Sequence, residues 1–126
     1  MTKNSSYFIV GGAGFIGSYF TDHLLSKATT EKVTLFDNFS SGREWHYKNH
    51  LNDPRFAVVR GDAKDLQHLT QSMRDHCIVI HLASNPDIAR AAKEPDIDFR
   101  EGTYLTQNVV EAMRLSGASE ILYASV

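Results

Sequence analysis

Residues 9–17 read IVGGAGFIG, a run of apolar side chains that leads directly into a cluster of glycines. The glycines fit two phosphate-binding spacings: Gly12, Gly14 and Gly17 fit G-x-G-x-x-G, whereas Gly11, Gly14 and Gly17 fit G-x-x-G-x-x-G. The cluster follows a predicted strand and opens a predicted helix, which favours an anion-binding turn over a purely structural one. In such a turn Gly11 permits the tight bend, Gly14 lets a ligand approach the backbone, and Gly17 lets the helix lie close to the strand.

The rest of the chain repeats this alternation of strand and helix. Short runs rich in β-branched and aromatic residues are followed by longer segments with helical periodicity, and the strand runs are continuously apolar, as in a parallel sheet covered on both faces. The sequence therefore predicts an α/β fold, a Rossmann-type doubly wound parallel sheet, in one domain over residues 1–126. The predicted strands cover 7–10, 32–36, 56–60, 77–83 and 120–125, the predicted helices cover 15–27, 65–75 and 96–115, and 38–55 is predicted to be a loop with one short helix.

Helical periodicity predicts which faces of the first and last helices are buried. Apolar residues recur at intervals of three and four positions in both segments, and Gly117 is placed to end the last helix. The predicted core faces are Phe15, Ile16, Phe20, Leu24 and Leu25 in the first helix, and Phe99, Leu105, Val109, Ala112 and Met113 in the last.

An acidic residue strengthens the prediction of a dinucleotide site. Asp37 comes 20 residues after Gly17 and directly follows the strand at 32–36, where a carboxylate accepts hydrogen bonds from the adenosine ribose hydroxyls. A negative charge there repels a 2′-phosphate, so the site is expected to prefer NAD to NADP, unless Arg43 folds back and softens that preference.

Two further strand ends are expected to face the same crevice, because the carboxyl ends of parallel strands share one edge of the sheet. Asp62 follows the strand at 56–60 and is expected either to accept from the adenine amino group or to serve as a cap or turn aspartate. Ala83 and Ser84 are small enough to let the nicotinamide half approach the backbone. His81, within the fourth strand, is expected to pack in the core.

Composition narrows the class of partner. The chain has 126 residues, 42% of them apolar, with 13 basic and 15 acidic side chains and a formal net charge of -2. No basic surplus points to nucleic acid or an anionic membrane, so a small-molecule partner is expected. The sequence has one cysteine, no signal-like apolar start and no apolar run of membrane-spanning length, which predicts a cytoplasmic protein.

Other candidate sites are weak. His46 and His50 are four residues apart but have no third ligand at metal-binding spacing, so no metal site is predicted. Cys77 is expected to be a small buried hydrophobe rather than a nucleophile. Trp45 and Tyr47 are expected to be exposed in the loop.

Four motifs stand in order along the chain: GGAGFIG (11–17), DNFSSGR (37–43), GD (61–62) and HLAS (81–84). Together they resemble the extended short-chain dehydrogenase/reductase family, in its NAD-dependent epimerase/dehydratase branch. The resemblance implies contacts to NAD from each motif. By that likeness the backbone of Phe15 and Ile16 meets the pyrophosphate, Asp37 and Asn38 hold the ribose, Ser40, Ser41 and Gly42 line the adenosine side, Asp62 and Ala63 flank adenine, and Leu82, Ala83 and Ser84 lie along the middle of the cofactor.

The resemblance also implies a role in nucleotide-sugar chemistry. The family's catalytic Ser or Thr follows the fifth strand, and its Tyr-x-x-x-Lys comes later, whereas this sequence ends at YASV (123–126). We therefore expect an incomplete NAD-binding domain of a nucleotide-sugar epimerase, truncated after the fifth strand and inactive alone, with no catalytic residue assigned to Ser125 or Val126. The open sheet edge predicts a homo-oligomer.

Two alternatives remain from the sequence. The first is a nucleotide-sugar 4,6-dehydratase, decarboxylase or other dehydrogenase of the same family, because the cofactor half does not determine the substrate. The second is a non-catalytic NAD-sensing or subunit-interaction module.

Overall fold

The computed structural model describes residues 5–84, 92–94, 96–97 and 99–124. Five parallel strands form one sheet in the order β3-β2-β1-β4-β5, which confirms the predicted doubly wound α/β fold. The strands are β1 (Ser5–Val10), β2 (Thr30–Asp37), β3 (Phe56–Arg60), β4 (Ile78–His81) and β5 (Glu120–Tyr123), and the helices are α1 (Phe15–Leu25), α2 (Leu66–Met73) and α4 (Tyr104–Ser116). Ser125 and Val126 lie outside the described residues.

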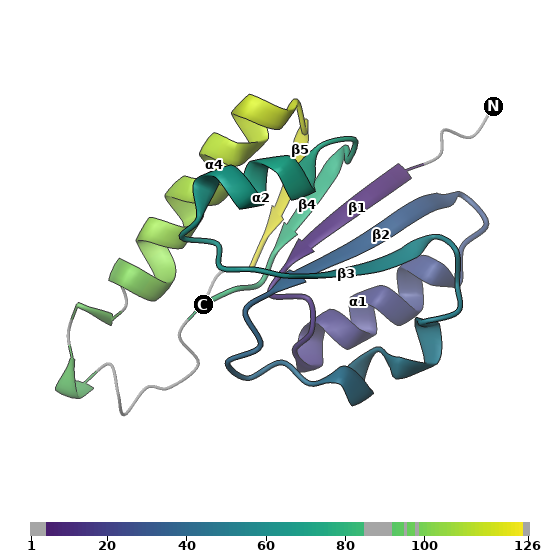
Figure 1. Cartoon of the computed structure of the whole chain (residues 1–126), viewed down its shortest axis with the longest axis horizontal. Coiled ribbons are helices and arrows are strands. Elements are labelled where there is room, and N and C mark those ends of the chain that lie inside the picture. Colours follow the sequence, from purple (N-terminus) through teal and green to yellow (C-terminus); the bar gives the residue numbers. More distant parts are fainter. Residues whose placement is uncertain (1–4, 85–91, 95, 98, 125–126) are drawn as a thin grey trace.

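Helices cover both faces of the sheet. Figure 1 shows α2 and α4 on one face and α1 on the other. Neighbouring residues of β1 point to opposite faces, so Phe8 packs beneath α2 and α4 while Ile9 packs beneath α1, and both are 0% exposed. The first core also contains Val10, Phe36, Leu69, Met73, Val79 and Val109, and the second contains Leu24, Leu25, Val33, Leu35, Phe56 and Ile80.

The buried face of α1 differs from the predicted one. Leu24 and Leu25 are buried as expected, together with Gly17 and Thr21. Phe15 and Ile16 are 64% and 58% exposed, because the first turn of α1 lines a cavity instead of packing on the sheet. The prediction that these two side chains belong to the core was wrong.

The last predicted helix is shorter than expected at its start. Phe99 begins a π-helical turn, η3 (Phe99–Thr103), and is exposed, so its predicted place in the core was wrong. Leu105, Val109 and Ala112 are buried against the sheet as predicted. Gly117 ends α4 with φ of 88°, and its N–H donates to the carbonyl of Met113, as expected for a helix-ending glycine.

The connection from β2 to β3 carries two 3₁₀ turns, η1 (Glu44–His46) and η2 (Lys48–His50), where the sequence predicted one short helix. Trp45 is exposed as predicted, but Tyr47 is buried between Phe39 and Phe56. Burial and the neighbouring Glu44 carboxylate raise the pKa of Tyr47. An aromatic side chain in a polar stretch therefore fixes this connection to the second core.

Arg55 joins the start of β3 to the end of α1. Its guanidinium donates at 2.7 Å to the carbonyl of Leu25, which has no acceptor role within α1, and at 3.0 Å to the carbonyl of Lys27, which also accepts from Thr30 N–H. Asp53 holds the same guanidinium at 2.8 Å, and this contact lowers the pKa of Asp53 to about 2.

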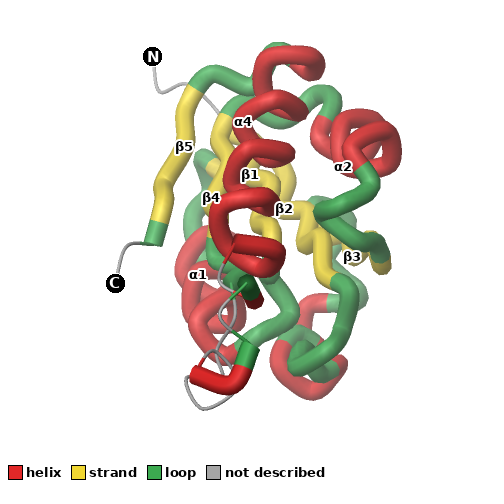
Figure 2. Tube along the Cα trace, turned by 90° about the vertical axis from the view of Figure 1, so that its left-hand side faces the viewer, coloured by secondary structure: helices red, strands yellow, loops and turns green. Residues whose placement is uncertain are grey.

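The opposite edge of the sheet is open in the described part of the chain. β5 pairs with β4 on one side and lies at the edge of the sheet (Figure 2). All four of its residues are exposed, including Leu122 at 53% and Tyr123 at 57%. Cys77, just before β4, is exposed as well, so the prediction of a buried thiol was wrong.

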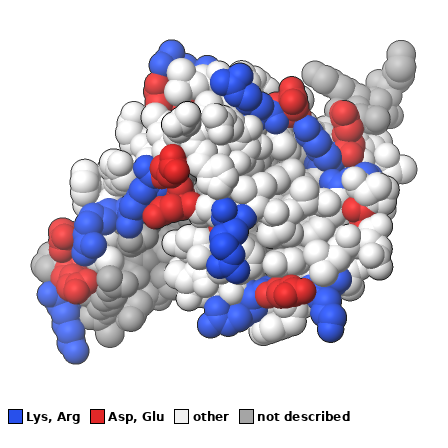
Figure 3. All heavy atoms as spheres, viewed as in Figure 1, with Lys and Arg blue, Asp and Glu red and all other residues white. Residues whose placement is uncertain are grey.

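The surface carries both signs of charge. Lys and Arg side chains are interspersed with Asp and Glu on the face seen in Figure 3. Within the described ranges, no helix combines the length and the apolar character that a membrane span requires.

Candidate functional site: a cavity at the carboxyl ends of the strands

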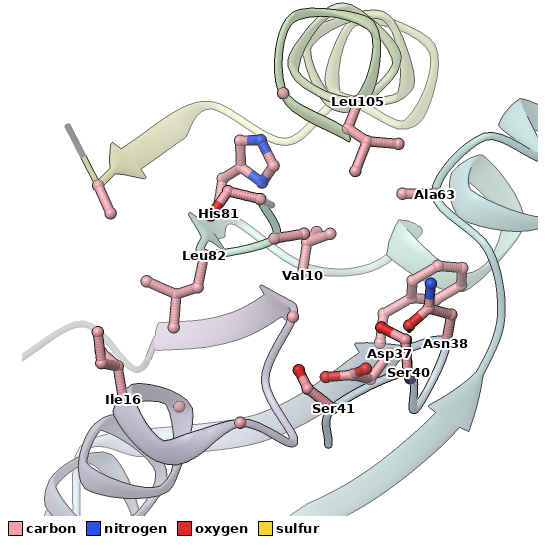
Figure 4. A pocket seen from close by; sticks show the side chains of 18 of the residues that line it. Val10, Ile16, Asp37, Asn38, Ser40, Ser41, Ala63, His81, Leu82 and Leu105 are labelled. Atoms are coloured by element: carbon pink, nitrogen blue, oxygen red, sulfur yellow. Dashed lines mark hydrogen bonds between the residues drawn. The ribbon is translucent and has the colours of Figure 1, made fainter. Parts of the chain in front are cut away.

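A cavity of about 680 Å³ lies where the five strands end. Val10, Asp37 and His81 reach it from the ends of β1, β2 and β4, and Ala63, after β3, closes another side (Figure 4). Tyr123, at the end of β5, lines it as well. The chain reverses its direction of strand addition between β1 and β4, which is where open α/β sheets bind ligands. The volume falls in the usual range for small-molecule and cofactor sites.

All but one of the residues expected to contact the cofactor line this cavity. Gly42 does not: it packs behind the wall, where an added Cβ would lie 2.8 Å from the Cβ of Ala13. The predicted residues that the structure brings together are Gly11, Gly14, Phe15, Ile16, Gly17, Asp37, Asn38, Ser40, Ser41, Asp62, Ala63, Leu82, Ala83 and Ser84.

The structure requires glycine at some positions of the loop but not at others. Gly11 has φ of 80°, and a Cβ there would lie 2.7 Å from the backbone nitrogen of Ala83. A Cβ on Gly17 would collide with the carbonyl of Gly12. At Gly14 the nearest atom to an added Cβ is the Gly11 carbonyl oxygen at 3.6 Å, an ordinary contact. The fold therefore requires Gly11 and Gly17, whereas the missing side chain of Gly14 leaves an open approach to the backbone.

The start of α1 is prepared to receive an anion. Gly14 occupies the N-cap without a capping side chain, and the first turn contains no acidic residue. The first hydrogen bond of the helix runs from Ser18 N–H to the Gly14 carbonyl at 3.1 Å, so the N–H groups before Ser18 have no acceptor within the helix. These donors and the helix dipole together attract negative charge.

Asp37 connects the end of β2 to the glycine loop. One carboxylate oxygen accepts from Ala13 N–H at 2.9 Å and the other accepts from Phe39 N–H at 2.8 Å. Each oxygen keeps a further lone pair, and the side chain lines the cavity. The Arg43 guanidinium instead donates to the Gly42 carbonyl. Among the described lining residues the charged side chains are Asp37 and Asp62, so this part of the cavity wall is acidic.

Asp62 lines the cavity from the loop after β3 and also stabilises that loop. Its carboxylate accepts from Lys64 N–H at 2.9 Å, so the turn role expected as an alternative is present. The cap of α2 is Asp65, which accepts from His68 N–H. Asn108 of α4 donates to the Ala63 carbonyl at 2.9 Å, which holds the loop against the cavity.

His81 is 1% exposed, as expected for a histidine within the fourth strand. Its Nε2 lies 3.0 Å from the Thr106 hydroxyl, and its buried Nδ1 has no partner among the described residues. Burial lowers the pKa of His81 to about 4, so the ring is neutral at pH 7. The ring faces the cavity on the side of α4 (Figure 4).

The structure adds lining residues that the sequence did not predict, among them His46, Thr106 and Tyr123. His46 and His50 do not face each other: His46 contacts the Ala13 carbonyl, and His50 pairs with Asp22. No group of three metal-ligating side chains occurs within the described ranges. The contact of His46 joins positions 33 residues apart, so no local pattern could indicate it.

Comparisons with known proteins agree with this geometry. The model of the NAD dependent epimerase/dehydratase family matches residues 7–126. The chain belongs to this family. It is 31% identical over 119 residues to a UDP-glucose 4-epimerase of Mycolicibacterium smegmatis, covering 93% of this chain and 37% of that protein. It is 30% identical to a UDP-N-acetyl-alpha-D-glucosaminuronate decarboxylase of Bacillus cytotoxicus, covering 93% of this chain and 35% of that protein.

A solved structure has the same architecture. The crystal structure of UDP-glucose 4-epimerase from Brucella ovis in complex with NAD superposes with a TM-score of 0.84 at 26% identity, covering 96% of this chain and 35% of the other. The chain of this epimerase/dehydratase family member thus spans about a third of the length of the relatives it matches.

Proposed function

We propose that this chain binds NAD in the cavity at the carboxyl ends of the strands, as one NAD-binding domain over residues 1–126. The main support for this proposal is Gly14. The fold has room for a side chain at this position, yet the residue is glycine and its backbone is open to the cavity; it also lies at the start of α1, which has no side-chain cap. This arrangement fits a pyrophosphate, which needs close backbone approach and free N–H donors. The NAD complex of the Brucella ovis relative supports the same ligand.

In this proposal the residues divide along the dinucleotide. The N–H groups of Phe15 and Ile16 hold the pyrophosphate, Asp37 accepts from the adenosine ribose, and Asp62 lies near the adenine. Ala83 and Ser84 leave room for the nicotinamide half. Bound NAD supplies a hydride acceptor, while these residues bind and orient it.

We further propose that the domain belongs to a nucleotide-sugar epimerase of the UDP-glucose 4-epimerase type, acting in the cytoplasm as a homo-oligomer. The similarity to the Mycolicibacterium smegmatis epimerase favours this reaction. The similarity to the Bacillus cytotoxicus decarboxylase supports the second candidate, a decarboxylase of the same family. The 126 residues contain no Tyr-x-x-x-Lys, so we expect no turnover of UDP-galactose by this chain alone.

Calorimetric titration of the purified chain with NAD and with NADP tests the binding proposal. We expect saturable NAD binding and weaker NADP binding, because Asp37 repels the 2′-phosphate. A parallel incubation with UDP-galactose and NAD tests the expected absence of turnover. Failure to bind either dinucleotide at millimolar concentration would remove the proposed function.

A further inference from the structure

One residue of the glycine loop, Ala13, is held from outside the loop by three hydrogen bonds. Its N–H donates to Asp37 at 2.9 Å, and its carbonyl accepts from the backbone N–H of Arg43 at 3.1 Å and from Nδ1 of His46 at 2.6 Å. Ala13 itself is 0% exposed. Through Arg43 and His46, the connection between β2 and β3 therefore holds the glycine loop that the proposed pyrophosphate would contact.

The contact defines the state of the His46 ring. A carbonyl oxygen can only accept, so Nδ1 carries the proton in this hydrogen bond. The ring also contacts Trp45, with centroids 4.0 Å apart and planes inclined by 59°, and it lines the cavity. Of the two groups that donate to the Ala13 carbonyl, the imidazole is the one supplied by a side chain and can be removed by substitution.

Holding this carbonyl also orients the next N–H group. The Ala13 carbonyl and the Gly14 N–H belong to one planar peptide and point in opposite directions. Gly14 is the N-cap of α1 and lines the cavity. A donor that fixes the carbonyl on one side therefore fixes the direction of the backbone at the open helix start.

We propose that His46 is a positioning residue for the pyrophosphate-binding loop, acting through the Ala13–Gly14 peptide; the inference rests on the proposed dinucleotide site. His46 keeps the loop in its binding arrangement before a ligand arrives. Such preorganisation improves affinity by reducing the ordering that binding requires. Its effect falls on ligands that contain a pyrophosphate and spares those that contact only the adenosine side.

The test compares substitutions at His46 with a matched change at His50. His50 lies in the adjacent 3₁₀ turn, pairs with Asp22 at 2.5 Å, and does not line the cavity, so His50→Ala controls for loss of a histidine contact in the same connection. His46→Asn keeps a side-chain N–H donor of similar reach, whereas His46→Leu has similar bulk to Asn but no donor. NAD and ADP are titrated by calorimetry and adenosine by NMR.

We expect His46→Ala and His46→Leu to weaken NAD and ADP binding about tenfold, as for the loss of one hydrogen bond in a preorganised site, and to change adenosine binding less than twofold. His46→Asn should retain most of the affinity, and His50→Ala should match the unmodified chain. Melting temperatures without ligand show which variants fold. If His46→Ala does not fold, the comparison of His46→Asn with His46→Leu still tests the proposal.

Two results would overturn the inference. Equal NAD affinity in the Asn and Leu variants would show that the side-chain N–H donor at position 46 does not contribute to binding. An equal loss for adenosine and ADP would indicate general disturbance of the connection instead of loop positioning. If the unmodified chain bound no NAD, the proposed function itself would fail and this inference with it.

Discussion

Replacing Gly14 with alanine separates ligand binding from folding. The added Cβ would lie 3.6 Å from its nearest neighbour, and the backbone has φ of -82° and ψ of -177°, which alanine adopts without strain. Alanine is a poorer N-cap than glycine by roughly 0.5–1 kcal/mol, but it reduces the entropy of the unfolded chain by about 0.4–1 kcal/mol. The two effects oppose each other, so the free energy of unfolding should change by less than about 1 kcal/mol.

Binding should respond differently. A methyl group on the open backbone keeps a phosphate from its closest approach to the N–H donors, and the loss of one or two such hydrogen bonds costs about 1–3 kcal/mol. NAD affinity should therefore fall about tenfold to a hundredfold in calorimetry, while urea unfolding stays nearly unchanged. Gly17→Ala is the contrasting variant, because its clash with the Gly12 carbonyl destabilises the fold. Unaltered NAD affinity in a folded Gly14→Ala chain would refute the assignment of the phosphate position.

Three further predictions follow from other contacts. Asp37→Ala should weaken NAD binding by about 1.5–3 kcal/mol through loss of a charge-assisted hydrogen bond, and should reduce the preference over NADP; equal losses for both cofactors in calorimetry would contradict it. His81 is neutral when folded, with a pKa of about 4 against an ordinary 6.5, so its contribution to stability is present above pH 6.5 and falls as the pH drops toward 4. The buried His76, whose pKa is also lowered, destabilises the unmodified chain and His81→Phe alike as the pH falls, so in urea unfolding the unmodified chain should lose about 3 kcal/mol more than His81→Phe between pH 7 and pH 4; the same pH dependence in both proteins would argue against His81 as the source. The exposed β5 edge should allow self-association that Leu122→Lys reduces, and sedimentation that finds only monomer at high concentration in the unmodified chain would oppose it.

The sequence was sufficient for the order of elements and for most of the cavity wall. Strands that are buried on both faces, such as β1, carry a continuous apolar run, and the glycine turn has a fixed relation to the strand before it and the helix after it. Asp37 and Asp62 could be predicted as cavity residues because each lies at or just after the end of a strand. Such features are local in sequence, so they can be predicted before the fold is known.

Features that depend on distant contacts could not be predicted in this way. Periodicity places Phe15 and Ile16 with the core face of α1, but periodicity does not indicate where the sheet ends beneath the helix. Tyr47 is buried by Phe39 and Phe56, neither of which is adjacent to it in sequence. His46 reaches Ala13 across 33 residues for the same reason.

The contact of Arg55 with the end of α1 has a consequence for the order in which the chain can fold during synthesis. The carbonyls of Leu25 and Lys27 are made well before Arg55, which later donates to both. Thr30 already donates to the carbonyls of Leu24 and Lys27, but until Arg55 emerges from the ribosome the Leu25 carbonyl must rely on water, and the helix end will fray more readily. The first βαβ unit therefore acquires the hydrogen bond from Arg55 to the end of α1 only when the start of β3 has been synthesised. A nascent chain that stalls before Arg55 should unfold locally at the end of α1 more often, and proteases and chaperones should then bind it more readily.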